Sequence, residues 1–165
     1  MLDPKTISTL KRISIRGRVA YGACCLENAM LHFKIKNDVL DEVIWRIWTF
    51  TSSNNLDEWD ELTNEVNPIC ILDENIPSDP LFLLYTALPF DLVDMVSEVI
   101  EIGVGNLYAG TGEYSPSTLE HLINVIEKCM ILKIELPVFA HFERSSFSEE
   151  HGWGLERDKS FFAEN

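Results

Sequence analysis

Apolar side chains that recur every three or four residues are the feature that most restricts how this sequence can fold. The first such stripe comprises Val19, Ala23, Leu26, Met30 and Phe33, with spacings of four, three, four and three residues. This spacing places all five on one face of a helix with 3.6 residues per turn, whereas a half-buried strand would show alternation. The stripe therefore predicts a helix over residues 18–36.

Further stripes and their boundary residues predict the other helices. Asn37 is a suitable N-cap, and acidic residues follow it where the helix dipole favours them. Asn55 with Glu58 three residues later resembles a capping box, and Asp79-Pro80 is typical of a helix start. The predicted helices cover about residues 18–36, 38–51, 55–66, 81–88, 91–102 and 116–134.

The segments between these helices are expected to be irregular. Residues 1–17 form a short basic segment, 68–78 a loop, 103–116 a loop rich in Gly, Ser and Pro, and 136–142 is compatible with a strand. The lack of alternating strand and helix periods argues against a doubly wound sheet. We expect one all-α domain spanning residues 1–165. It is either an irregular helical bundle or a short α-solenoid-like array of about six helices, with room for one short strand pair near the C-terminus.

The tail over residues 143–165 is aromatic, charged and aperiodic, and it either packs on the helical body or is frayed. Trp153 stands between Gly152 and Gly154, which indicates a sharp turn that seats a large aromatic side chain. Two interpretations remain open. The turn clamps the tail onto the body, or it presents Trp153 to a partner, because tryptophan is favoured at interface hot spots.

The cysteines do not indicate a disulfide framework or a metal site. Cys24 and Cys25 are adjacent in a predicted helix, Cys70 and Cys129 lie far apart, and no CxxC motif occurs. The N-terminus lacks the apolar stretch of a signal peptide, and no window reaches the roughly 18 apolar residues of a membrane span. We therefore expect a reducing cytoplasm, with the cysteines as small core residues.

The charge of the chain restricts its partners. The formal net charge is -14. Residues 1–36 hold seven Lys/Arg against two Asp/Glu, residues 37–80 hold one against eleven, and residues 81–165 hold five against fourteen. An excess of carboxylates argues against direct nucleic-acid binding and against an anionic membrane surface. It permits a basic protein partner.

The predicted helix over 55–66 concentrates this acidity. Asp57, Glu61 and Glu65 are spaced by four residues, with Glu58 and Asp60 beside them, and the helix contains no Lys or Arg. Like charges at this spacing destabilise a helix by roughly 0.2–0.5 kcal/mol per pair. The face is either a solvated surface that keeps the protein in solution or a docking face for a cationic partner.

No motif indicates catalysis, a cofactor or a metal. The glycines of residues 103–112 lack the lysine of a phosphate loop and one glycine of a dinucleotide fingerprint, so a helix end and a flexible loop are the simpler interpretation. A cysteine nucleophile would need an exposed thiol of low pKa, and a helical apolar stripe is the opposite environment. The four histidines show no metal-ligand spacing, so we predict no catalytic, cofactor-binding or metal-binding residues.

The sequence resembles the immunity proteins of bacterial polymorphic toxin and contact-dependent growth inhibition systems. The strings that carry this resemblance are Arg18-Val-Ala-Tyr-Gly22, Trp48-Thr-Phe-Thr-Ser-Ser53 with Leu56-Asp-Glu-Trp59, and Ser146-Phe-Ser148 with Gly152-Trp-Gly154. The resemblance implies stoichiometric binding of a cognate toxin domain, with a cationic nuclease as the natural target. An acidic surface would imitate nucleic-acid charge and occlude the active site.

The partner-binding hypothesis names the acidic residues of the 55–66 helix together with tryptophans, which serve as anchors if they are exposed. These residues are Asp57, Glu58, Asp60, Glu61, Glu65, Trp45, Trp48, Trp59 and Trp153. Two other classes of function remain as alternatives. A helical scaffold or adaptor would bind another basic protein or peptide, and an enzyme would assemble its site from residues distant in sequence.

Overall fold

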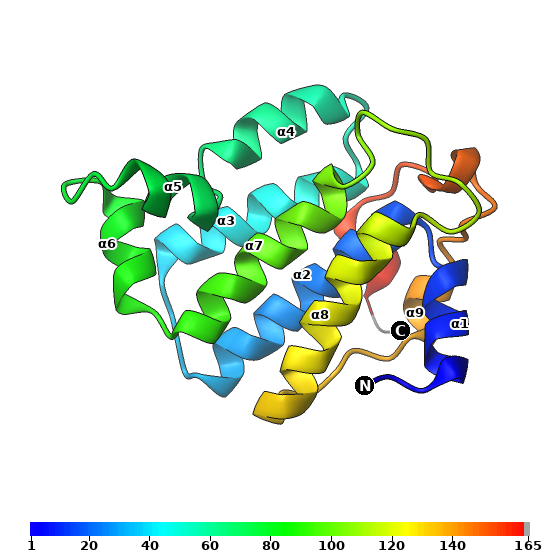
Figure 1. The fold of residues 1–165 in the computed structure, drawn as a ribbon, viewed down its shortest axis with the longest axis horizontal. Helices are drawn as coiled ribbons and strands as arrows, with labels where there is room; N and C mark the ends of the chain where they lie inside the picture. Colours follow the sequence, from blue (N-terminus) through cyan, green and yellow to red (C-terminus); the bar gives the residue numbers. More distant parts are fainter. Residues whose placement is uncertain (164–165) are drawn as a thin grey trace.

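The computed structural model describes residues 1–163, and this part of the chain forms nine α-helices joined by turns (Figure 1). The α-helices are α1 (Pro4–Arg12), α2 (Ile15–His32), α3 (Asp38–Trp48), α4 (Leu56–Asn64), α5 (Pro68–Glu74), α6 (Pro80–Ala87), α7 (Phe90–Val104), α8 (Pro116–Leu132) and α9 (Ala140–Glu143). Three short 3₁₀ helices are η1 (Thr49–Thr51), η2 (Glu150–Gly152) and η3 (Lys159–Phe162). The predicted all-α fold class is confirmed.

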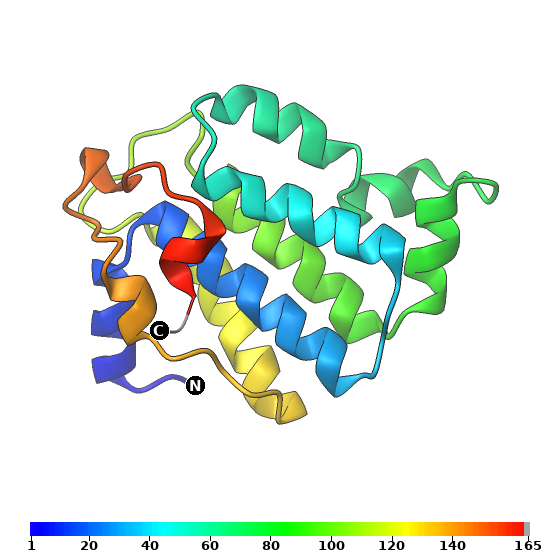
Figure 2. The same cartoon turned by 180° about the vertical axis from the view of Figure 1, so that it is seen from behind.

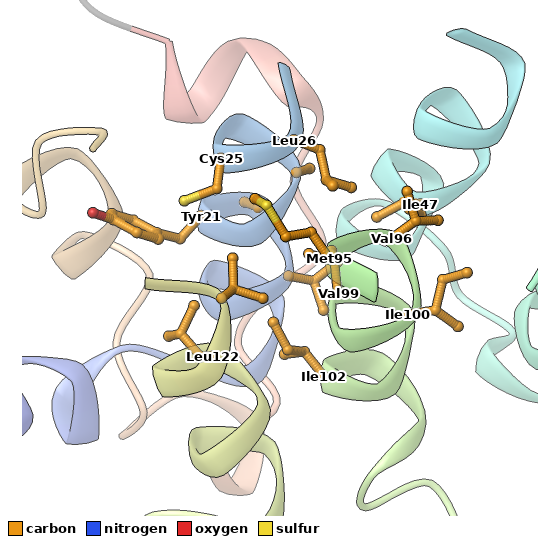
Figure 3. Packing of buried hydrophobic residues seen from close by; sticks show 14 of the residues in the cluster. Tyr21, Cys25, Leu26, Ile47, Met95, Val96, Val99, Ile100, Ile102 and Leu122 are labelled. Carbon is orange, nitrogen blue, oxygen red and sulfur yellow. The ribbon is translucent and has the colours of Figure 1, made fainter. Parts of the chain in front are cut away.

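Helix α2 is the central element, and α3, α7 and α8 pack around it as an irregular bundle (Figures 1 and 2). Its buried side chains point in several directions: Met95 of α7 lies near Cys25 and Leu26, whereas Tyr21 points to the other side and packs against Phe139 and Phe142 (Figure 3). This central position explains why α2 is buried on nearly all sides, including every residue from Ile15 to Ala23.

A glycine lets α7 approach α2 closely. A Cβ atom added at Gly22 would lie 3.0 Å from both methyl carbons of Val99, which is tighter than ordinary van der Waals contact. The missing side chain therefore lets two central helices pack at short range.

Two segments that were expected to be irregular are helices, so the predicted number of six is too low. Asp3 caps α1 by accepting hydrogen bonds from the backbone N–H groups of Lys5 and Thr6. Asn67 caps α5 in the same way, with Pro68 in the first turn. Proline is well tolerated at the first position of a helix because its missing N–H is not needed there. Asn67-Pro68, predicted to end the preceding helix, thus starts a new one, because α4 has already ended at Asn64.

The segment that was expected to be β-compatible, residues 136–142, is not a strand. Residues 136–138 have no regular secondary structure, residue 139 is in a turn, and residues 140–142 belong to α9. In the described part of the chain, strand-like pairing is limited to one antiparallel bridge between Ile13 and Ser146. The sequence allowed one short strand pair near the C-terminus. The structure has a single bridge there, which joins the tail to the α1–α2 junction.

The tail is packed rather than frayed over the residues that the structure describes. Its backbone exchanges hydrogen bonds with the α1–α2 junction, from Phe147 N to Arg12 O (2.7 Å), from Ser14 N to Ser145 O (2.8 Å) and from Arg16 N to Trp153 O (3.0 Å). Gly152 and Gly154 both have positive φ angles, as the predicted sharp turn requires. The end of the chain thus covers the start of α2 (Figure 2).

None of the helices found in residues 1–163 is both long enough and apolar enough to cross a membrane.

Candidate functional site

Trp45 on α3 differs from the other tryptophans because 61% of its surface is exposed. Trp48 and Trp59 are only 6% and 3% exposed, and Trp153 is half-buried in the tail. Of the four predicted anchors, Trp48 and Trp59 therefore fail the condition of exposure. Trp45 offers most of its indole ring to a partner.

A pocket of about 520 Å³ lies on one side of Trp45, between α2, α3 and the tail. We call it the tail pocket. Its lining residues are Glu27, Met30, Asp41, Ile44, Trp45, Trp48, Thr49, Thr51, Ser52, Asp158 and Lys159. Indole rings and carboxylates therefore share one concave surface.

A second pocket, of about 390 Å³, lies on the other side of Trp45, between α3 and α4. We call it the α3–α4 pocket. It is lined by Glu42, Trp45, Arg46, Thr49, Ser52, Ser53, Asn54, Asn55, Glu58, Trp59, Leu62 and Thr63. Trp45 lines both pockets, so they adjoin along its exposed ring.

The walls of the α3–α4 pocket are held by a hydrogen bond between its two helices. The indole N–H of Trp59 donates to the backbone carbonyl of Arg46 at 2.9 Å. A Cβ atom on Gly103 would lie 2.6 Å from the Trp59 ring, so α7 packs closely beneath this side chain. Trp59 is therefore a structural residue of the pocket floor.

The predicted acidic face of α4 is only partly available to a partner. Asp57, Glu58 and Glu61 are exposed, whereas Asp60 is 9% exposed and accepts a hydrogen bond from the Tyr108 hydroxyl at 3.0 Å. This hydrogen bond to a carboxylate raises the pKa of Tyr108 above its ordinary value. Asp60 therefore holds the 105–115 loop against α4.

Arg46 of α3 neutralises another part of this face. Its guanidinium lies 3.3 Å from Glu65 and 3.4 Å from Glu42, and it donates to the Leu62 carbonyl at 3.0 Å. The α4 helix lacks a cation of its own, but its neighbour supplies one near its C-terminus. Asp57, Glu58 and Glu61 are thus the predicted acidic residues that remain exposed and outside the described ion pairs.

Two buried arginines were missed by the sequence analysis. Arg18 is fully buried and donates to the Ser115 carbonyl at 3.0 Å and to the Thr118 hydroxyl at 2.8 Å. Arg16 donates to the carbonyls of Gly154 (3.0 Å) and Ser53 (2.8 Å). Neither forms an ion pair with a carboxylate in the part of the chain described. Burial lowers the pKa of Arg18 to about 10, because desolvation disfavours the charged form.

These arginines connect separate segments of the chain. Arg16 joins the tail turn and the α3–α4 connection to the start of α2, and Arg18 joins α2 to the start of α8. The available sequence signal was that basic residues stand inside an otherwise apolar helix. Buried arginines of this kind fix the position of loops because their fork of donors has defined directions.

The thiols and histidines do not form a reactive cluster. Burial raises the pKa of Cys24 to about 12 and that of Cys25 well above its ordinary value, so both are protonated at neutral pH. The Nδ1 atom of His121 lies 2.7 Å from Glu98, between α7 and α8. Among residues 1–163, no group of three or more His, Cys, Asp or Glu side chains is arranged to hold a metal ion.

The comparisons give no relative from which a function could be transferred. No protein-family model, no curated protein and no solved structure matches the chain. The two pockets that flank Trp45, and the carboxylates around them, are therefore the basis for a functional proposal.

Proposed function

We propose that this chain is an immunity protein that binds a cognate toxin domain and neutralises it. The toxin would be a cationic nuclease whose active site is occluded by the acidic surface of α3 and α4. The proposal places the complex in the cytoplasm, gives the chain no catalytic role and no cofactor, and includes no direct contact with nucleic acid or membrane.

One observation carries the proposal: an exposed tryptophan stands between two adjoining pockets whose rims carry carboxylates. Binding energy at interfaces concentrates in tryptophan, tyrosine and arginine residues that fit into pockets of the partner. Trp45 would be such an anchor. Asp57, Glu58 and Glu61 would provide complementary charge, which accelerates association and selects basic partners.

The first experiment is co-expression with the toxin domain encoded beside this gene. Protection of growth and stoichiometric co-purification are expected. A toxin domain that still kills the cells, with no complex recovered, would contradict the proposal.

Charge reversal then tests the face. The triple variant Asp57→Lys, Glu58→Lys and Glu61→Lys should weaken binding and reduce its dependence on salt. The matched control reverses Glu113, Glu120 and Glu135, which are exposed residues outside the described ion pairs. Both variants change the net charge equally. Equal losses of affinity would show that only total charge matters and would remove α4 from the interface.

A second candidate function is a helical adaptor for another basic protein or peptide. A separate apolar surface favours it, because Ile69, Leu72, Ile76, Leu83 and Phe90 are exposed on and around α5, α6 and the start of α7. An adaptor has two partner surfaces, whereas neutralisation of a toxin needs one. Ile69→Ser and Leu83→Ser variants that keep full protection against the toxin would leave this surface outside the immunity function.

A further inference from the structure

The tail pocket already contains a cation from the protein itself. The Lys159 ammonium lies 3.0 Å from the Glu27 carboxylate and 5.0 Å from the centre of the Trp48 ring. The Trp48 indole N–H donates to the same Glu27 oxygen at 2.5 Å. An ammonium that meets a carboxylate and the face of an indole is bound by charge and by the ring quadrupole together.

Lys159 is only loosely enclosed at this position. Its side chain is 60% exposed, and it belongs to the short η3 helix at the end of the tail. By contrast, Trp48 is almost fully buried and Glu27 is half-buried on α2. Glu27 and Trp48, which bind the ammonium, are therefore held in place by the helical body. Lys159 itself lies at the exposed mouth of the pocket.

The pocket also has more negative charge than Lys159 can balance. Glu27, Asp41 and Asp158 all line it. Asp41 and Asp158 are exposed, and neither forms an ion pair with a cation in residues 1–163. One ammonium thus faces three carboxylates, which leaves the pocket with a net charge of about -2 at neutral pH.

We propose that the tail pocket is a binding site for an arginine side chain of the partner, and that Lys159 occupies this site in the unbound protein. The arriving guanidinium displaces Lys159 from Trp48 and Glu27. Its planar fork pairs with Glu27 and Asp41 and stacks on the indole surface, which an ammonium cannot do equally well. This inference rests on the proposed function, because it names the group of the basic partner that enters the pocket beside Trp45.

The direct test uses N-acetyl-arginine methylamide as the probe and N-acetyl-citrulline methylamide as its uncharged counterpart. The four tryptophan indole N–H signals are followed by ¹⁵N NMR during titration of the full chain. We expect the arginine probe to shift the Trp48 and Trp45 signals and to leave Trp153, which lies outside the pocket, unchanged. The citrulline probe should shift none of them. Equal effects of both probes, or no effect of either, would overturn the proposal.

Three variants test the assignment of residues. Lys159→Gln removes the side chain that competes with the probe and should tighten probe binding about two- to fivefold. The reason is that the apparent affinity of a ligand falls with the fraction of molecules whose site is already occupied, here by Lys159. Asp41→Asn should weaken it by about the same factor. Asp73→Asn, at an exposed position of α5 outside the pocket, is the matched control and should have no effect. Unchanged or weaker binding by Lys159→Gln would show that Lys159 does not occupy the arginine site.

The toxin assay separates this inference from the proposed function. If the arginine probe does not bind but the chain still protects cells from the toxin, the arginine site is wrong and the immunity function stands. If the probe binds as described but no neighbouring toxin is neutralised, the site stands and the immunity function is wrong.

Discussion

Gly154 holds the tail turn at a φ angle of +83°, which L-residues with a side chain rarely adopt. Its Cα atom also faces the start of α2. A Cβ atom at this position would lie 2.7 Å from the Cβ of Ser14, and closer still to the Ser14 hydroxyl oxygen. Ser14 cannot easily move, because it is fully buried and caps α2 by accepting a hydrogen bond from Gly17 N at 3.0 Å. Gly154→Ala should therefore loosen the tail from the body.

Two effects contribute to the expected fall in the free energy of unfolding of Gly154→Ala. A left-handed backbone costs a residue with a side chain about 1–2 kcal/mol. Overpacking against a buried, rigid neighbour costs about 1–3 kcal/mol more. We therefore expect Gly154→Ala to lower the free energy of unfolding by about 2–5 kcal/mol. For a chain of this length, each kcal/mol corresponds to a fall in Tm of about 2–4 °C.

Two other glycines separate these contributions. Gly112 has a φ angle of +61°, and no other atom of residues 1–163 lies within 4 Å of an added Cβ, so Gly112→Ala measures the backbone cost alone. Gly110 also has no such neighbour and is not among the glycines with positive φ, so Gly110→Ala should be nearly neutral. Urea unfolding followed by circular dichroism gives the three free energies. If Gly154→Ala costs no more than Gly112→Ala, the close contact between the tail and the start of α2 is refuted.

Three further predictions concern single side chains. Arg18→Lys should lower the free energy of unfolding by about 2–3 kcal/mol in urea titrations, because an ammonium cannot make the hydrogen bonds of the planar guanidinium. A loss below about 0.5 kcal/mol would contradict this. Glu149 forms two 2.8 Å hydrogen bonds with Arg157, and this contact lowers the pKa of Glu149. The stabilisation is therefore present above the unfolded pKa of about 4.3 and is lost as pH falls through the lower folded value. Glu149→Gln should cost about 1–2 kcal/mol at pH 7 and less at pH 3, and an equal cost at both values would exclude the ion pair as the cause. Trp45→Ala should change the free energy of unfolding by less than about 0.5 kcal/mol, yet weaken toxin binding at least about 30-fold in calorimetry. Trp59→Ala, at a buried position, should instead lower the free energy of unfolding by about 3–5 kcal/mol. Unchanged toxin affinity for Trp45→Ala would exclude it as an anchor.

The long amphipathic helices were predictable because their periodicity and caps agree. On α3 the apolar residues Leu40, Val43, Ile44, Ile47 and Trp48 recur every three or four positions, and all of them are buried. Trp45 lies outside that stripe and is exposed. On α4, Trp59 lies three residues after Leu56 and seven before Val66, on the face that packs against the body, and it is buried as well. The exposure of Trp45 and the burial of Trp48 and Trp59 therefore follow from periodicity, which does not apply to Trp153 in the tail.

The short helices were not predictable from periodicity. The seven residues of α5 make about two turns, too few for a repeating stripe, and a helix of this length depends on tertiary packing. The ion pairs of the site could not be predicted either. Arg46 and Glu65 are 19 residues apart, and Lys159 and Glu27 are 132 residues apart, so only the folded chain brings them together.

The tail also has a consequence for the order of events during synthesis. The hydrogen bonds that join Ser14 and Arg16 to the tail connect residues more than 130 positions apart, so they close one of the longest loops in the chain. Such contacts form late, because the entropy of closing the loop opposes them until other helices have docked. Once α8 has left the ribosome, α2, α3, α7 and α8 can pack together, but Arg16 lacks its Gly154 partner until the tail has emerged as well. Protease sensitivity at the α1–α2 junction in stalled chains of increasing length would show when this last step takes place.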